Sequence, residues 1–155
     1  MDVSPISGDI FKEAWVGRGM ATGDLDNDGK IDAVVTTNGG SAYVLHNETA
    51  SNNHWITLRL IGHKSNRDGI GAVVNLTTAQ GSQWATVTTS SSYLSASDPR
   101  VHFGLGSSAM ADRIEIRWPS GIVQTLTSVK GDRQVQIDEP VATGSQTAVE
   151  KANHP

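Results

Sequence analysis

The chain of 155 residues contains no cysteine, so it offers neither a disulfide framework nor a thiolate for metal binding or catalysis. Long apolar runs are also missing, because no stretch approaches the ~20 residues that a membrane-spanning helix needs. Residues 1–15 lack the charged start and apolar core of a signal peptide. We therefore expect no membrane insertion, and residues 1–15 give no information about export.

Basic residues are scarce as well, since 12 Lys and Arg stand against 16 Asp and Glu, for a formal net charge of −4. No basic stripe runs through the sequence, which argues against nucleic-acid binding. The hydrophobic fraction, 37%, is that of a folded soluble domain. The length allows one full domain, or one domain with a small appendage.

Helical periodicity is absent from the sequence, which instead contains short runs in which apolar and polar residues alternate. In RIEIRW (113–118) the apolar side chains fall on one face and the charged ones on the other, and the turn at 119–121 predicts a hairpin. The pattern favours an all-β fold, an antiparallel β-sandwich or barrel-like module. The predicted strands cover residues 19–22, 31–37, 42–46, 54–61, 71–78, 83–89, 100–105, 113–118, 122–129 and 133–138.

The acidic segment GDLDNDGKID (23–32) has carboxylates at positions one, three, five and nine of a loop, and glycine at position six. Alternate side chains of a tightly turned loop converge on one point, Gly29 permits the sharp turn, and the Lys30 carbonyl can add an oxygen. This spacing predicts an all-oxygen site for Ca²⁺. The candidate ligands are Asp24, Asp26, Asp28, Lys30 and Asp32.

Alternatives to a calcium loop remain open. Four carboxylates this close repel one another without a cation, so we expect the empty loop to be poorly ordered. Magnesium prefers a smaller octahedron that retains waters, and an EF-hand is disfavoured because position twelve is Val35 rather than glutamate. A metal-free Asx-rich turn is the remaining possibility, but it does not explain the alternate acids.

Residues 17–47, GRGMATGDLDNDGKIDAVVTTNGGSAYVLHN, resemble an FG-GAP or VCBS repeat, the calcium-binding blade of integrin-α-like propellers. Downstream, residues 53–76, 92–106 and 114–126 resemble the ASPIC/UnbV domain, which follows such repeats in cartilage acidic protein-like and bacterial propeller proteins. The resemblance implies a calcium-dependent C-terminal module that is secreted, periplasmic or on the cell surface. One departure is the serine-rich segment 88–98, where relatives tend to have glycines.

The fold expected from the residues and the resemblance together is all-β: a partial propeller blade, carrying the calcium loop, packed on an antiparallel β-sandwich or barrel-like module. We expect a lead-in at residues 1–17, the calcium-binding hairpin at 18–47, the ASPIC/UnbV-like β domain at 48–140 and a disordered tail at 141–155.

Two polar loops of the second module are candidates for ligand binding, since loops on a rigid β scaffold commonly carry recognition. The alternative is structural: their Arg and Asp side chains tie the loops to one another and cap strand ends. The candidate residues are Asn66, Arg67, Asp68, Tyr93, Ser95, Asp98 and Arg100.

Catalysis finds little support, because neither a nucleophile elbow nor a zinc-type histidine spacing occurs. We therefore expect a non-enzymatic calcium-binding module for extracellular protein or glycan recognition and adhesion. A purely structural capping domain is the second hypothesis, and an enzyme or biosynthetic accessory protein is the third.

One partial blade lacks the neighbours that repeat units need to bury their faces. Two arrangements fit: the blade docks on the sandwich of its own chain, or two chains pair through the exposed blade edge as a homodimer. The linker before residue 54 is short, so we expect docking within a monomer.

Overall fold

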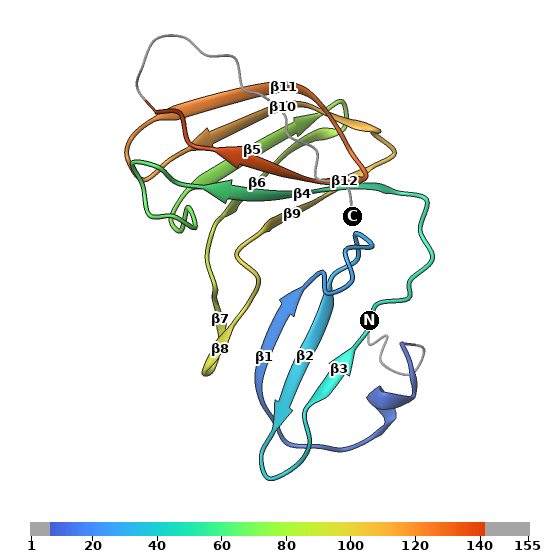
Figure 1. The fold of residues 1–155 in the computed structure, drawn as a ribbon. Helices are drawn as coiled ribbons and strands as arrows, with labels where there is room; N and C mark the ends of the chain where they lie inside the picture. Colours follow the sequence, from blue (N-terminus) through green and yellow to red (C-terminus); the bar gives the residue numbers. More distant parts are fainter. Residues whose placement is uncertain (1–6, 142–155) are drawn as a thin grey trace.

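The computed structural model describes residues 7–141 and is all-β there, apart from the 3-10 turn η2 (Asp9–Lys12). Figure 1 shows a small sheet with a larger body above it. The all-β expectation is confirmed. Within the described residues, no helix is long and apolar enough to cross a membrane. The predicted disordered tail, apart from Val141, lies outside the described residues.

The larger body is a β-sandwich of two sheets that do not close into a barrel (Figure 1). Its four-stranded sheet has the order β11-β10-β5-β6 and its three-stranded sheet the order β12-β4-β9. Neighbours are antiparallel except β12 and β4, which pair in parallel. The strands are β4 (His54–Ile61), β5 (Val73–Thr78), β6 (Gly81–Thr86), β9 (Val101–Gly106), β10 (Met110–Arg117), β11 (Val123–Lys130) and β12 (Arg133–Asp138).

The core lies between these two sheets and takes alternate residues from each. Ile114 and Ile116 are fully buried, as the alternation of RIEIRW predicts, while Arg113 and Arg117 lie on the outer face. Burial of each such side chain contributes roughly 1.5–3 kcal/mol, so the alternation fixes which face of β10 points inward. The predicted turn closes with a hydrogen bond from the Trp118 amide to the Ile122 carbonyl.

The smaller sheet consists of β1 (Gly17–Gly23), β2 (Asp32–Thr37) and β3 (Tyr43–Leu45) in that order, all antiparallel. The acidic loop connects β1 to β2 at the end that faces the sandwich (Figure 1). This sheet is the hairpin unit expected from the sequence, and its two predicted edge strands start and end within two residues of the observed ones.

A two-stranded hairpin that the sequence did not predict extends from the sandwich and lies along β1 (Figure 1). It consists of β7 (Ser90–Ser92) and β8 (Ser95–Ala96). Hydrogen bonds join it and the following residues to β1, among them Met20 N to Ser92 Oγ at 3.3 Å, Thr22 N to Ser97 Oγ at 3.1 Å and Asp98 N to Thr22 O at 3.0 Å. The small sheet is therefore packed on the sandwich of its own chain.

Candidate metal centre

The acidic loop turns tightly because two of its residues adopt positive φ, Asn27 at 61° and Gly29 at 87°. Asp24 holds the turn together, since its carboxylate accepts hydrogen bonds from the amides of Asp28 at 3.1 Å and Gly29 at 3.0 Å. Asparagine and glycine tolerate this backbone region better than other residues. The sequence Asn-Asp-Gly thus wraps the chain around the Asp24 carboxylate.

Carboxylates of the loop converge, as the spacing predicts. Ligand atoms of Asp24, Asp26 and Asp32 lie within 4.8 Å of one another, and a second group joins Asp26 to Asp28 and His46. Asp24 and Asp32 are only 5% and 1% exposed, although a carboxylate is normally found at the surface. Two buried acids beside a third form a concentrated negative site.

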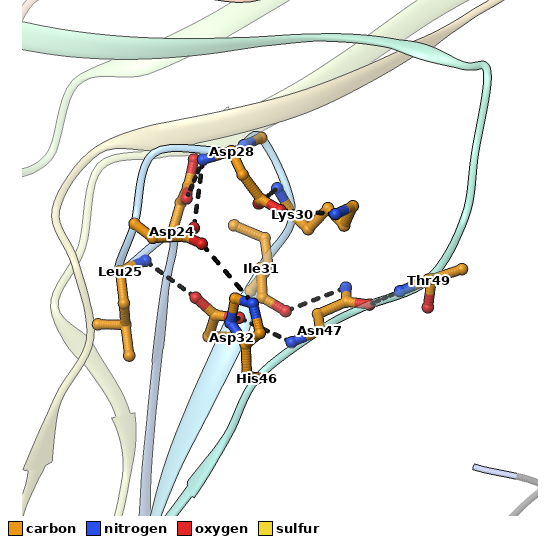
Figure 2. A network of polar contacts seen from close by, with 11 residues as sticks. Asp24, Leu25, Asp28, Lys30, Ile31, Asp32, His46, Asn47 and Thr49 are labelled. Atoms are coloured by element: carbon orange, nitrogen blue, oxygen red, sulfur yellow. Dashed lines mark hydrogen bonds and ion pairs between the residues drawn. The ribbon is translucent and has the colours of Figure 1, made fainter. Parts of the chain in front are cut away.

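Asp32 is held at the start of β2 by contacts from two segments, the acidic loop and the residues after β3 (Figure 2). Its carboxylate accepts the amides of Asn47 at 2.8 Å and Leu25 at 3.0 Å, and lies 3.1 Å from Nδ1 of His46. The Asn47 amide is the largest cause that lowers the pKa of Asp32. Asp32 is therefore a carboxylate that backbone amides hold in place and favour as an anion.

His46 belongs to the site, although it is not among the ligands predicted from the sequence. Its Nε2 lies 3.6 Å from Asp26 in addition to the Nδ1 contact with Asp32. The signal that identifies it is the strand register, since Leu45 pairs with Ala33, the residue after Asp32. That pairing can be read only when the strand partners are known.

Asp28 and Lys30 form a pair at the rim of the loop (Figure 2). The Lys30 ammonium donates to Asp28 at 2.6 Å, and this bond lowers the pKa of Asp28 and raises the pKa of Lys30. The contacts that the structure gives for Lys30 come from its amide and ammonium groups, both to Asp28. Its carbonyl oxygen, the predicted ligand, is not among them.

The donor set suits a hard cation. Carboxylate oxygens dominate the two groups, one imidazole lies beside them, and no thiolate exists in the chain. Oxygen ligands of this kind are those of calcium, magnesium and manganese rather than of softer metals. The residues present could therefore hold a hard metal ion, the class to which the predicted calcium belongs.

Trp55 of β4 covers the loop from the sandwich side. A Cβ atom added at Gly29 would lie 2.0 Å from Cε2 of the Trp55 indole, so only glycine fits there. The indole stacks on His102 of β9, with ring centroids 5.9 Å apart, and burial lowers the pKa of His102. Gly29 therefore serves both the turn and the contact with the sandwich.

Arg100 joins the loop to the second module. Its guanidinium donates hydrogen bonds to the Asp24 carbonyl at 2.7 Å, to Asn27 Oδ1 at 2.7 Å and to Gln134 Oε1 at 3.0 Å. Its Nε donates to the Asp98 carboxylate at 2.6 Å. Both side chains of the Asp98–Arg100 pair are largely buried. One arginine thus connects the acidic loop, the segment before β9 and strand β12.

Comparison with protein-family models matches residues 62–144 to the family described as ASPIC and UnbV. The chain belongs to the ASPIC and UnbV family. Cartilage acidic protein 1 of Xenopus tropicalis is 30% identical over 136 residues, which are 84% of this chain and 21% of that protein. Cartilage acidic protein 1 of Homo sapiens is 29% identical over 134 residues, 81% of this chain and 19% of that protein. The chain spans about a fifth of the length of these relatives.

The ASPIC and UnbV match begins at residue 62, after the acidic loop, and contains β5 to β12. It also contains all seven residues predicted for ligand binding. The structure does not bring these seven together. Three of them, Asp68, Asp98 and Arg100, line a cavity of about 310 Å³ with Arg59 and Gln134.

The other four candidates lie apart from the Asp98–Arg100 pair. Asn66 bonds within its own loop to both backbone groups of Ile70, and Arg67 pairs at the surface with the adjacent Asp68. Tyr93 and Ser95 belong to the β7–β8 hairpin, where Ser95 Oγ donates to the Tyr93 carbonyl at 2.9 Å. Arg67 therefore does not tie its loop to another one, whereas Arg100 does.

Sequence reasoning missed Glu139, a buried carboxylate of the ASPIC and UnbV region. It accepts the amides of His63, Lys64 and Ser65 at 2.7–2.8 Å, and the hydroxyls of Ser65 and Ser120. Burial alone would raise its pKa, but the Ser120 hydroxyl and the three amides lower it to about 2. Glu139 fixes the loop after β4 to the turn before β11, and every oxygen is already in use.

Proposed function

We propose that the loop from Asp24 to Asp32 binds Ca²⁺ and that the chain is a non-catalytic recognition module whose two parts are fastened by that ion. The observation that carries this proposal is the convergence of Asp24, Asp26 and Asp32 within 4.8 Å, with two of the three carboxylates buried. Such a cluster is costly without a cation, because like charges in a partly buried site repel strongly.

Calcium is the preferred occupant because it accepts six to eight oxygens in a flexible arrangement, whereas magnesium requires a small octahedron and keeps several waters. Asp24 and Asp32 are already oriented by backbone amides, so they form a rigid base for the ion. Asp26 and Asp28 are more exposed and complete the site from the outside.

The loop with its flanking strands resembles an FG-GAP or VCBS repeat, and we propose that the chain is part of a larger propeller protein. The large unmatched part of the cartilage acidic protein 1 relatives leaves room for such repeats. A secreted, periplasmic or cell-surface location follows from this proposal, because calcium is abundant there. Recognition or adhesion to a protein or a glycan is the role proposed for the module.

The experiment is thermal melting of the intact chain in chelator, in Ca²⁺ and in Mg²⁺. A ligand that binds only the folded state stabilises it by ~2.7 kcal/mol at a hundredfold excess over Kd, so calcium should raise the melting temperature clearly and magnesium weakly. Asp26→Asn should abolish the rise, whereas the matched control Asp112→Asn, at an exposed site in β10, should keep it. A melting curve that chelator leaves unchanged would contradict the calcium site.

A purely structural capping domain is the second candidate, and the contacts of Arg100 favour it. Both oxygens of Asp98 and most donors of Arg100 are engaged inside the protein, which leaves little of this pair for a ligand. Substitution of Asp98 would then reduce stability without affecting any binding. Loss of a bound glycan or protein by a variant that melts like the parent would favour recognition instead.

A further inference from the structure

The outer face of the four-stranded sheet presents a polar row across all four strands. Antiparallel register places Trp84 of β6 opposite Asn75 of β5, Asn75 opposite Glu115 of β10, and Glu115 opposite Thr125 of β11. Directly opposed residues point to the same side of a sheet, about 5 Å apart. The four side chains therefore form one line on the surface, which we call the open row.

Trp84 is the most exposed aromatic side chain among the described residues, at 75%. Its neighbours do not cover it, because β6 is the edge strand and the adjacent Ser82 and Thr86 are small. Indoles bury large areas when they contact a partner, so this one offers a flat apolar surface at low entropic cost. The surrounding hydroxyls include a Thr77–Ser82 pair at 2.9 Å.

Around Glu115, in the middle of the open row, the outer face carries more positive than negative charge, because Arg113 and Arg117 flank it on β10. The Glu115 carboxylate forms ion pairs with the guanidinium groups of Arg113 at 2.6 Å and Arg117 at 2.9 Å, so two guanidiniums share one carboxylate. The arginine side chains are 55% and 68% exposed, whereas the glutamate is 19% exposed. Several guanidinium donors thus face solvent, and planar oxyanions are the groups that they bind best.

We propose that the open row binds an oligosaccharide that carries carboxylate or sulfate groups. The apolar face of one sugar ring packs on Trp84, its hydroxyls bond to Asn75, and an acidic group further along the chain pairs with Arg113 and Arg117. The row crosses the four strands in steps of about 5 Å, which suits a linear saccharide. This proposal names a partner for the recognition role proposed above and rests on it, without using the acidic loop.

The chemistry of the face favours a glycan over a protein partner. Protein interfaces bury a central apolar cluster in which charged residues are depleted. Around Trp84 the open row and its flanking positions are mostly amides, hydroxyls and charges. The valines of this face are the half-buried Val73 of β5 and the exposed Val123, which lies on β11 at the other edge of the sheet. One isolated indole among hydrogen-bonding groups matches the mixed surface of a sugar.

The test is titration of the intact chain, followed by tryptophan fluorescence and calorimetry, with three defined probes: trigalacturonate, sulfated maltotriose and neutral maltotriose. Production in a bacterium that does not glycosylate keeps Asn75, which begins an Asn-Leu-Thr sequon, unmodified. We expect one or both acidic probes to bind at least about tenfold more tightly than maltotriose, and added salt to weaken them. The two acidic probes distinguish carboxylate from sulfate recognition.

Variants assign the binding to the open row. Trp84→Ala and the double variant Arg113→Gln with Arg117→Gln should each weaken the acidic probe at least about tenfold. The control Leu94→Ala removes an apolar residue that is 89% exposed on the β7–β8 hairpin and should change nothing. Unaltered melting temperatures verify the fold of each variant, and an unaltered calcium shift separates this test from that of the loop.

The following results would contradict glycan binding at the open row. If none of the three probes binds, or if Trp84→Ala binds like the parent, the open row is not a glycan site. Equal affinity for neutral and acidic probes would remove the role of the arginines. Capture of a protein partner that depends on Trp84, in place of saccharide binding, would show that the face is a protein interface and overturn the proposal.

Discussion

The guanidinium of Arg100 donates to the backbone carbonyl of Asp24 at 2.7 Å, which links two residues 76 positions apart in the sequence. The contact joins the first residue of the acidic loop to the segment that precedes β9. Asp24 and Arg100 also share the lining of a second cavity, with Thr57 and His102. The order of the acidic loop and the attachment of the small sheet therefore both depend on Arg100.

Arg100→Ala and Asp98→Ala should each destabilise the protein, because removal of one member of a largely buried pair leaves the other charge unpaired. We expect a loss of about 2–3 kcal/mol in the free energy of unfolding, measured by urea denaturation. Arg67→Ala is the matched control, since its side chain is 84% exposed and pairs only at the surface, and it should change stability by less than ~0.5 kcal/mol. Equal effects at the two arginines would mean that the Arg100 contacts do not hold the modules together.

Gly29→Ala should separate the acidic loop from the sandwich. The added methyl group would overlap the Trp55 indole, and φ at this position is 87°. Gly39→Ala separates these two causes, because Gly39 also has a positive φ, 76°, but its Cβ would meet nothing within 4 Å. Gly39→Ala should cost about 1 kcal/mol from backbone strain alone.

The measurement is calcium affinity by calorimetry together with thermal melting of both glycine variants. Gly29→Ala should lose more stability than Gly39→Ala and bind calcium at least about tenfold more weakly, since the loop that carries the ligands must shift. Two variants that behave alike would show that Trp55 does not constrain the loop.

Glu139 should make the free energy of unfolding depend on pH in the acidic range. Its pKa is lowered from 4.5 to about 2 in the folded protein, so the carboxylate stabilises the fold fully above pH 4.5 and this contribution is lost as the pH falls toward 2. The shift corresponds to a contribution on the order of 3 kcal/mol. Urea denaturation between pH 7 and pH 2 should show this loss in the parent.

Glu139→Gln removes the titration and should be less stable at neutral pH, because its amide group cannot accept all the bonds that the carboxylate accepts. The difference in unfolding free energy between parent and variant should therefore shrink as the pH falls below 4.5. Glu48→Gln, at an exposed linker position, is the control and should give a difference near zero throughout. A difference for Glu139→Gln that is constant with pH would assign the loss to packing alone.

Strands with strong alternation could be predicted from the sequence. Residues 54–61 and 133–138 were assigned with the observed bounds, because apolar and polar residues alternate there between turn signals. The β7–β8 hairpin was missed because Ser90–Ser92 has no apolar alternation and is held by hydroxyl contacts to β1. The parallel pairing of β4 with β12 was also missed, since alternation identifies a strand but not its partner.

The acidic loop was visible because all its carboxylates lie within nine residues, and local spacing determines their convergence. Contacts over long sequence distances were not visible. His46 reaches Asp32 through the β2–β3 register, and Arg100 reaches the loop only once the sandwich and the small sheet have packed. Glu139 could not be recognised because its partners are mostly backbone amides, which carry no sequence signal.

The linker between the two parts provides the final prediction. Residues 48–53 are exposed and have no regular secondary structure, so a protease should cut there. If Arg100 and Trp55 hold the small sheet in place, the cut protein should remain one particle in calcium, with the light-scattering mass of one 16.4 kDa chain. Chelation should release the N-terminal piece, and so should Arg100→Ala. Each change weakens the non-covalent contacts that hold the small sheet once residues 48–53 are cut. A mass of two chains would instead show a dimer, for which the edge strand β3, where Val44 is 65% exposed, is the expected contact. Release in calcium would show that the small sheet is not docked.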